Sequence, residues 1–154
     1  MIRRALWKDI PEINNLLYQV LNVHAKLRPD FFVTGTKKYT DDELKEIISD
    51  DNRPIFVYTN EYDKAVGYAF CILQEVNGVN VCSAKELYID DICVDEQYRG
   101  KHIATMLYEY VVEYGRKNHI DRITLNVWEG NDSARRFYEK MGMRPRKTML
   151  EQIL

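Results

Sequence analysis

The chain has 154 residues, of which 45% are hydrophobic and 30% are charged. This composition is that of an ordinary globular protein and excludes a disordered chain, and the length suits one domain with a single core. The 22 basic residues nearly balance the 24 acidic ones, so the net charge of -2 gives no general signal for nucleic acid binding. Because no repeat or flexible linker interrupts the sequence, we expect a single domain over residues 1–154.

The sequence also lacks signals for export, for a membrane and for a metal. No apolar stretch near the N-terminus has the length of a signal peptide, and no run of 18 apolar residues occurs anywhere. Cys71, Cys82 and Cys93 are odd in number and widely spaced, which is typical of reduced thiols, and the three histidines are scattered. We therefore expect a cytoplasmic protein with no metal, no membrane partner and no nucleic acid partner.

The first half of the chain predicts a strand, two helices and a hairpin. In chain order, we expect a strand at 2–6, a helix from 9 to about 27, a short acidic helix from 40 to 50, and paired strands at 54–59 and 65–75. Asp9 and Glu12 give the first helix a capping-box pattern. Thr40 and Glu43 give the second helix the same pattern.

The second half alternates between strands and helices. In chain order, we expect a strand at 85–94, a helix that begins at Gly100, a strand at 122–127, a helix over about 131–142 and a final strand at 143–154. Asn131 or Asp132 caps the last helix, and Gly142 ends it. Elements in this order predict a mixed α/β layer rather than a helical bundle or an all-β barrel.

The turn before the helix at Gly100 has the features of an anion site. The free N–H groups at a helix start favour a phosphate, and a glycine lets a ligand approach the backbone closely. Arg99 and Lys101 add positive charge on either side. An ordinary turn with solvated charges fits the same residues, and neither the nucleoside-triphosphate loop nor the dinucleotide fingerprint is present.

The last helix places Asn131, Ala134 and Tyr138 on one face. That face could present an amide and a phenol to one ligand. The alternative is a core stripe in which the Tyr138 ring is buried.

These two segments carry a resemblance to a known family. Residues 97–102 (Gln-Tyr-Arg-Gly-Lys-His) resemble the [Gln/Arg]-x-x-Gly-x-[Gly/Ala] motif of the GNAT superfamily of N-acetyltransferases. Residues 131–142 resemble its downstream motif at the expected interval, and the similarity covers roughly residues 87–143. The resemblance implies an α/β fold with a mixed, centrally splayed β-sheet flanked by helices on both faces. It also implies acetyl transfer from acetyl-CoA to a primary amine by direct attack.

The resemblance further implies which residues bind and react. The pyrophosphate of CoA would lie on the amides of 99–105, the pantetheine arm would pair with 92–94, and Tyr138 would give a proton to the departing thiolate. The expected cofactor-binding residues are Ile92, Cys93, Val94, Arg99, Gly100, Lys101, His102, Ile103, Ala104, Thr105, Asn126, Asn131 and Ala134. His102 departs from the Gly/Ala of the motif, and we expect it to keep right-handed helical angles, which tolerate a side chain.

Three acidic residues on the predicted strand 85–94 are candidates for the base that deprotonates the amine. Alternation places Glu86 and Asp90 on one face and Asp91 on the other, unless a bulge intervenes. Glu86 matches the base position of histone-type acetyltransferases, and Asp90 matches the position proposed in spermidine/spermine N-acetyltransferase. We rank Asp90 slightly first, and edge solvation or a salt bridge is the alternative. Cys93, of opposite parity to Asp90, is expected to pack rather than to act as a nucleophile.

The acceptor and the assembly stay open at this point. The segment from His24 to Phe32 could supply a polar wall and an aromatic floor for an amine, or simply end a helix. The acceptor is expected to be a small-molecule or peptide amine, and a homodimer is one option for the assembly. A CoA-binding regulatory module that has lost catalysis is the alternative function.

Overall fold

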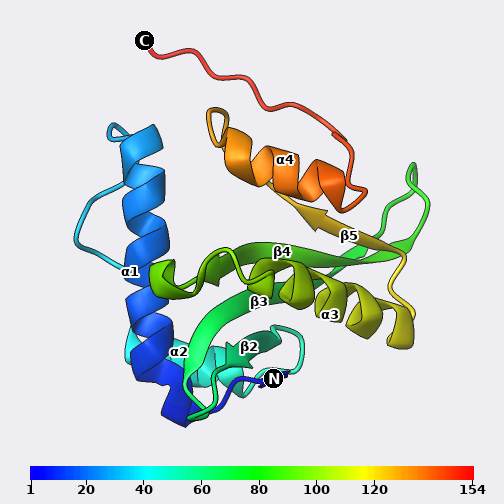
Figure 1. The fold of residues 1–154 in the computed structure, drawn as a ribbon. Helices are drawn as coiled ribbons and strands as arrows, with labels where there is room; N and C mark the ends of the chain where they lie inside the picture. Colours follow the sequence, from blue (N-terminus) through cyan, green and yellow to red (C-terminus); the bar gives the residue numbers. More distant parts are fainter.

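The structure is a computed structural model that describes residues 1–154 and is built on one five-stranded sheet. The strands, in sheet order, are β1 (Ile2–Arg4), β2 (Ile55–Thr59), β3 (Ala65–Val76), β4 (Ala84–Val94) and β5 (Arg122–Leu125). The first four strands pair antiparallel, whereas β5 pairs parallel to β4. This confirms the mixed sheet, with β5 at one edge (Figure 1).

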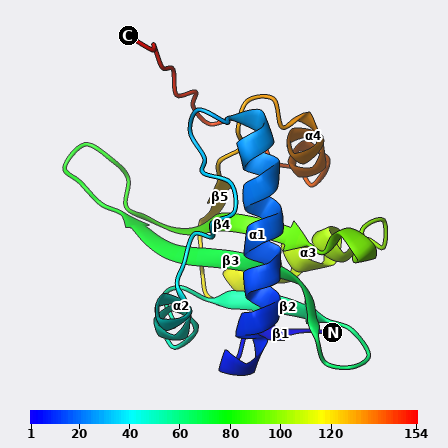
Figure 2. The same ribbon diagram turned by 90° about the vertical axis from the view of Figure 1, so that its left-hand side faces the viewer.

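Helices cover both faces of the sheet (Figure 2). They are α1 (Ile10–Leu27), α2 (Asp41–Ile48), α3 (Ile103–Lys117) and α4 (Asp132–Lys140), with short 3-10 turns at Trp7–Asp9 and Glu96–Tyr98. α1 and α2 pack on one face, and α3 and α4 pack on the other. None of the helices is both long and apolar enough to cross a membrane.

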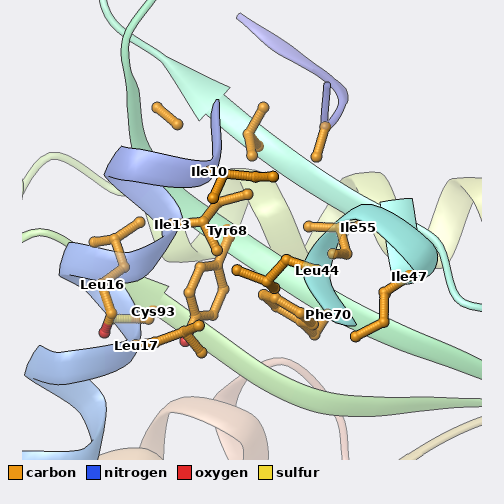
Figure 3. Close-up of a cluster of buried hydrophobic side chains, with 13 residues drawn as sticks. Ile10, Ile13, Leu16, Leu17, Leu44, Ile47, Ile55, Tyr68, Phe70 and Cys93 are labelled. Atoms are coloured by element: carbon orange, nitrogen blue, oxygen red, sulfur yellow. The ribbon is translucent and has the colours of Figure 1, made fainter. Parts of the chain in front are cut away.

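The core on the α1 face fixes the position of β3 and β4. The fully buried side chains of Ile13 and Leu16 on α1 and of Leu44 on α2 surround Tyr68 and Phe70 of β3 (Figure 3). The apolar residues of α1 recur at helical spacing, so one stripe of the helix faces the sheet. On the opposite face, α3 packs its own apolar stripe against β3 and β4.

Of the two predicted capping boxes, one is present and the other is absent. The Thr40 hydroxyl accepts from the Glu43 N–H, and the Glu43 carboxylate accepts from the Thr40 N–H, as expected for α2. Asp9 does not cap α1, so that expectation was wrong. Its carboxylate accepts from the Leu6 N–H at 2.8 Å and from the guanidinium of Arg3 instead. The arginine of β1 competes successfully because a charged donor binds a carboxylate more strongly than an amide does.

The expected final strand at 143–154 is absent. Residues 144–154 have no regular structure, and none of their backbone groups forms a hydrogen bond within the chain. This segment, which we call the C-terminal tail, leaves the body of the molecule beyond α4 (Figure 1). A strand forms only where another strand supplies the hydrogen bonds, and the tail has no such neighbour here.

Candidate active site

Six consecutive backbone N–H groups at the start of α3, from Gly100 to Thr105, donate no hydrogen bond within the chain. Gly100 has a φ of 79°, which lets the backbone turn sharply out of the preceding 3-10 turn, and no side chain caps the helix. Free N–H groups and the positive end of the helix dipole attract anions, phosphates above all. The exposed side chains of Arg99 and Lys101 strengthen this attraction.

The sheet splits open directly beside this helix start. β4 and β5 pair only over residues 86–89 and 122–125, while β4 continues to Val94 without a partner on that side. The strand predicted at 122–127 therefore ends two residues early, at Leu125. Residues 92–94 lie past the split, and their strand edge is free for an extended ligand.

α4 carries the phenol of Tyr138, which is close enough to Asp91 of β4 to feel its charge. Tyr138 packs against Phe137 and Tyr108, with ring centroids 5.1 Å and 6.2 Å apart. Its hydroxyl forms no hydrogen bond within the chain, yet it is not a fully buried unpaired atom, so solvent or a ligand can reach it. Burial and the negative charge of Asp91 raise the Tyr138 pKa, which keeps the phenol protonated and able to donate at neutral pH. Asn131 uses its side-chain oxygen to cap α4 at the Ala134 N–H.

A β-bulge brings the two aspartates of β4 to the same face. Phe70 pairs with Asp91 and Cys71 pairs with Ile89, so Asp90 has no partner on β3. Both carboxylates consequently point to the α1 face, where Tyr68 and Tyr39 contact them. Strict alternation fails at this point because a bulge adds one residue to one strand.

The two carboxylates have different environments. Asp90 binds the Lys38 ammonium with both oxygens, at 2.7 and 2.9 Å, and accepts from the Tyr39 hydroxyl at 3.2 Å. Asp91 accepts a 2.7 Å hydrogen bond from Tyr68. Burial, together with the neighbouring charge of Asp90, raises the Asp91 pKa to about 6, against the opposing effect of the Tyr68 hydrogen bond. A carboxylate with this pKa is ionised at pH 7 and still basic enough to take a proton.

Glu86 lies in a different arrangement. Its buried carboxylate accepts from Arg122 Nε at 2.7 Å and from Arg146 at 2.9 Å, and these partners lower its pKa. The Glu86–Arg122 ion pair joins β4 to β5 in the part of the sheet where the two strands are paired. The Glu86–Arg146 ion pair attaches the start of the tail to β4. A carboxylate held by two guanidinium groups is a weak proton acceptor.

The bulge also changes the expected position of Cys93. It lies on the same face as Asp91, in the α1 core, rather than on the opposite face from Asp90. Its sulfur contacts the Leu16 carbonyl at 3.5 Å, and burial raises the pKa of the thiol. The expectation that Cys93 packs rather than attacks fits this environment, because a neutral buried thiol is a poor nucleophile.

A cluster of aromatic side chains, which we call the aromatic wall, joins the segment after α1 to the segment after β5. Phe31 and Phe32, after α1, contact the ring of Trp128, after β5, with centroids 5.0 and 5.2 Å apart. The guanidinium of Arg28 lies 5.6 Å from the centre of the Trp128 ring, and the ring of His24 lies tilted against Phe32 with centroids 5.3 Å apart. The sequence pattern indicated the segment 24–32 as a possible acceptor site but did not indicate Trp128. The one sequence feature that could have pointed to Trp128 is its position just after a predicted strand.

Comparison with known proteins decides the family. The profile of the acetyltransferase (GNAT) family matches residues 20–143 of this chain. The crystal structure of a single-residue mutant of the BH1408 protein from Bacillus halodurans is 30% identical, covers 100% of this chain and 99% of its own, and superposes with a TM-score of 0.95. The chain belongs to the GNAT acetyltransferase family.

More distant members share the acetyltransferase fold. The aminoglycoside N-acetyltransferase AAC(6')-Iy, solved with CoA, is 14% identical over 100% of this chain and 98% of its own, with a TM-score of 0.75. An aminoglycoside acetyltransferase from an uncultured soil metagenomic sample is 17% identical over 100% of this chain and 95% of its own, with a TM-score of 0.74. No curated protein sequence matches the chain significantly. At these identities the two enzymes show a common fold and nothing of the acceptor.

One residue of this acetyltransferase departs from the sequence expectation. His102 was expected to keep right-handed helical angles, and this is wrong, because its φ and ψ are 60° and 20°. Of the two residues that the motif allows, only glycine suits this left-handed conformation, which costs an L-residue with a side chain about 1–2 kcal/mol. The side chain is exposed, so it meets no steric obstacle, and the amide still belongs to the row of free N–H groups.

The left-handed histidine gives a stability prediction. His102→Gly should raise the free energy of unfolding by about 0.5–1 kcal/mol, because relief of backbone strain outweighs the greater freedom of glycine in the unfolded chain. His119, with a φ of 56°, is the matched control, and His119→Gly should give a similar gain in urea denaturation. A loss of stability in His102→Gly alone would show that the histidine side chain is needed where it lies.

Proposed function

We propose that the protein is an N-acetyltransferase that moves the acetyl group of acetyl-CoA to a primary amine by direct attack. The observation that carries this proposal is the row of free amides at 100–105 beside the unpaired edge of β4 at 92–94. The amides suit the phosphates of CoA, and the strand edge suits its amide-containing arm. Acetyl-CoA, when bound, supplies an acetyl thioester, the acceptor supplies the amine that attacks it, and the groups that take and give protons belong to the chain.

The aspartate pair provides a path for the proton of the amine. An amine reaches the site largely as ammonium, and Asp90 already holds one ammonium, that of Lys38. We assign Asp90 the role of attracting the acceptor cation and Asp91 the role of taking its proton, since the raised pKa of Asp91 suits that role. Tyr138 donates its proton to the sulfur that leaves. Glu86, our other sequence candidate, better suits a structural role between two arginines.

The aromatic wall is the best candidate for acceptor contacts. Phe31 is 59% exposed although it touches Trp128, so its free side remains available to a ligand. Aromatic faces bind both apolar groups and cations, which fits a small-molecule or peptide amine. The similar protein AAC(6')-Iy is named an aminoglycoside N-acetyltransferase, which is consistent with an amine acceptor. Because it is only 14% identical to this chain, it shares the fold and gives no evidence on the acceptor of this chain.

Cofactor binding should depend on the free space at Gly100. Acetyl-CoA at about 100 times its dissociation constant should stabilise the protein by roughly 2.7 kcal/mol, visible as a higher melting temperature. Gly100→Glu should abolish this shift, because it places bulk and negative charge against the phosphates. Gly35→Glu is the matched control, since Gly35 also has a positive φ and open space around it. If wild type shows no shift at millimolar acetyl-CoA, the assigned cofactor site is wrong.

The base assignment predicts a pH profile. Wild-type kcat should fall as the pH drops through about 6, where Asp91 becomes protonated. Asp91→Asn should lower kcat about a hundredfold or more at pH 7 and remove this limb of the profile. Asp90→Asn should act mainly on the KM of the acceptor, and Glu86→Gln should lower stability more than turnover. Wild-type turnover in both Asp91→Asn and the Asp90/Asp91 double variant would rule out this proton path.

The role of Tyr138 is tested by removing one oxygen. Tyr138→Phe keeps the ring packing, so turnover should fall at least tenfold while acetyl-CoA affinity stays nearly constant, as for a contact formed mainly in the transition state. Tyr108→Phe, in the neighbouring ring, is the control and should leave turnover unchanged. Steady-state kinetics with calorimetric binding separates the two effects. Tight acetyl-CoA binding without turnover on any amine would instead favour an inactive CoA-binding module.

A further inference from the structure

The ammonium of Lys38 is held by the kind of groups that would bind an acceptor amine. Lys38 lies in the segment between α1 and α2, and its nitrogen binds both oxygens of Asp90 at 2.7 and 2.9 Å. The same nitrogen lies 5.4 Å from the centre of the Tyr39 ring. A carboxylate and an aromatic face both bind a free ammonium, so the chain holds one of its own lysines as it would hold an external amine.

The assigned base lies next to this ammonium. Asp91 follows Asp90 on β4, and the bulge turns both carboxylates to the α1 face. Burial raises the Asp91 pKa and the charge of Lys38 opposes this rise, so the ammonium is within electrostatic reach of the base. Burial and the charge of Asp91 raise the Tyr138 pKa. The lysine, the base and the acid are thus linked through one carboxylate.

The amine also lies beside the strand edge assigned to the arm of CoA. β4 has no partner on that side after Ile89, and Asp90 and Asp91 fill the step between Ile89 and the edge at 92–94. The Lys38 side chain is 55% exposed, whereas that of Asp90 is 12% exposed. A lysine on a flexible stem can therefore move its amine toward a thioester without disturbing the core.

We propose that Lys38 is a self-acetylation site, whose amine takes the acetyl group from acetyl-CoA bound to the same molecule. This inference rests on the proposed function and adds an acceptor that belongs to the chain.

The step balances with the groups already assigned. The Lys38 ammonium gives one proton to Asp91, and its nitrogen forms a C–N bond with the thioester carbon. The C–S bond breaks, and Tyr138 gives its proton to the sulfur. The second proton that the nitrogen loses returns to Tyr138, and Asp91 releases its proton to water. The products are an acetylated lysine, the thiol of CoA and one proton.

Uncatalysed acetylation would favour other lysines. Burial lowers the Lys38 pKa, but the hydrogen bond and the charge of Asp90 outweigh burial and raise it above its usual value. An amine held as ammonium is a poor nucleophile unless a base takes its proton. Selective modification of Lys38 therefore requires the base of the site.

The neighbouring lysine serves as a matched control. Lys37 is bound by Asp41 at 2.7 Å and by Asn14 at 2.6 Å, so its ammonium is held by α1 and α2 and not by β4. It has the same position in the chain as Lys38, within one residue, and also carries an ion pair. A reaction set only by local flexibility would modify both lysines, whereas the proposed reaction modifies Lys38.

The test is incubation of the purified full-length protein with acetyl-CoA and no other amine. Intact-mass spectrometry should show one added acetyl group per chain, and peptide mapping should place it on Lys38. Its first-order rate should not depend on protein concentration, because the reaction occurs within one molecule. Asp91→Asn should slow the reaction about a hundredfold. Lys38→Arg should take up no acetyl group at this position, and Lys37→Arg should be acetylated on Lys38 as wild type is.

Competition with CoA gives a control that does not depend on the fold of any variant. Excess CoA would occupy the cofactor site without supplying an acetyl group. It should slow the modification of Lys38 roughly tenfold or more at low acetyl-CoA, and it should leave chemical acetylation of exposed lysines unchanged.

Three results would overturn the proposal. The first is an unmodified Lys38. The second is acetylation spread over exposed lysines at a rate that neither Asp91→Asn nor CoA changes, which is chemical acetylation. The third is a rate that rises with protein concentration, which shows transfer between molecules.

A panel of external amines separates this inference from the proposed function. If an external amine is acetylated while Lys38 stays unmodified, self-acetylation alone is wrong. If acetyl-CoA binds and neither Lys38 nor any amine is acetylated, the proposed function is wrong as well.

Discussion

The site depends on one constraint, the end of pairing between β4 and β5 after Ile89 and Leu125. Up to that point the two strands share a parallel ladder, and beyond it β4 is held from one side by β3 alone. An unsatisfied strand edge is costly in a closed core, and it is useful where a ligand supplies the missing partners. The free amides of α3 follow the part of β4 that is unpaired on this side, the aspartates of β4 lie on that part, and we assign the phenol of Tyr138 to the same site.

Two of the three carboxylates of β4 are neutralised by cations. Glu86 neutralises Arg122 and Arg146 at the closed end, and Asp90 neutralises Lys38 nearer the opening. Asp91 has no cation of its own, and burial together with the charge of Asp90 raises its pKa, against the opposing effect of the hydrogen bond from Tyr68. One fold thus holds a structural carboxylate and a basic one on the same strand, and the difference arises from their partners.

Local patterns in the sequence predicted most of the fold and the position of the helix start at Gly100, because helical periodicity, caps and the Gly100 turn depend on near neighbours. Features set by distant contacts were harder to predict. The bulge that turns Asp90 and Asp91 to one face depends on how β3 packs, and Trp128 joins the site only through folding. The tail at 144–154 reads as a strand, yet a strand needs a neighbour that sequence pattern does not reveal.

Amide hydrogen exchange by NMR, with and without saturating CoA, tests the central claim most directly, because it reports on the backbone groups assigned to the ligand. The account predicts that CoA slows exchange in two separate segments, at 100–105 and along 92–94, by at least tenfold. The N–H groups of 100–105 and those N–H groups of 92–94 that point away from β3 are free, so both segments should gain hydrogen bonds together. Protection confined to other parts of the chain, or none at all, would contradict the assignment of the split between β4 and β5 as the cofactor site.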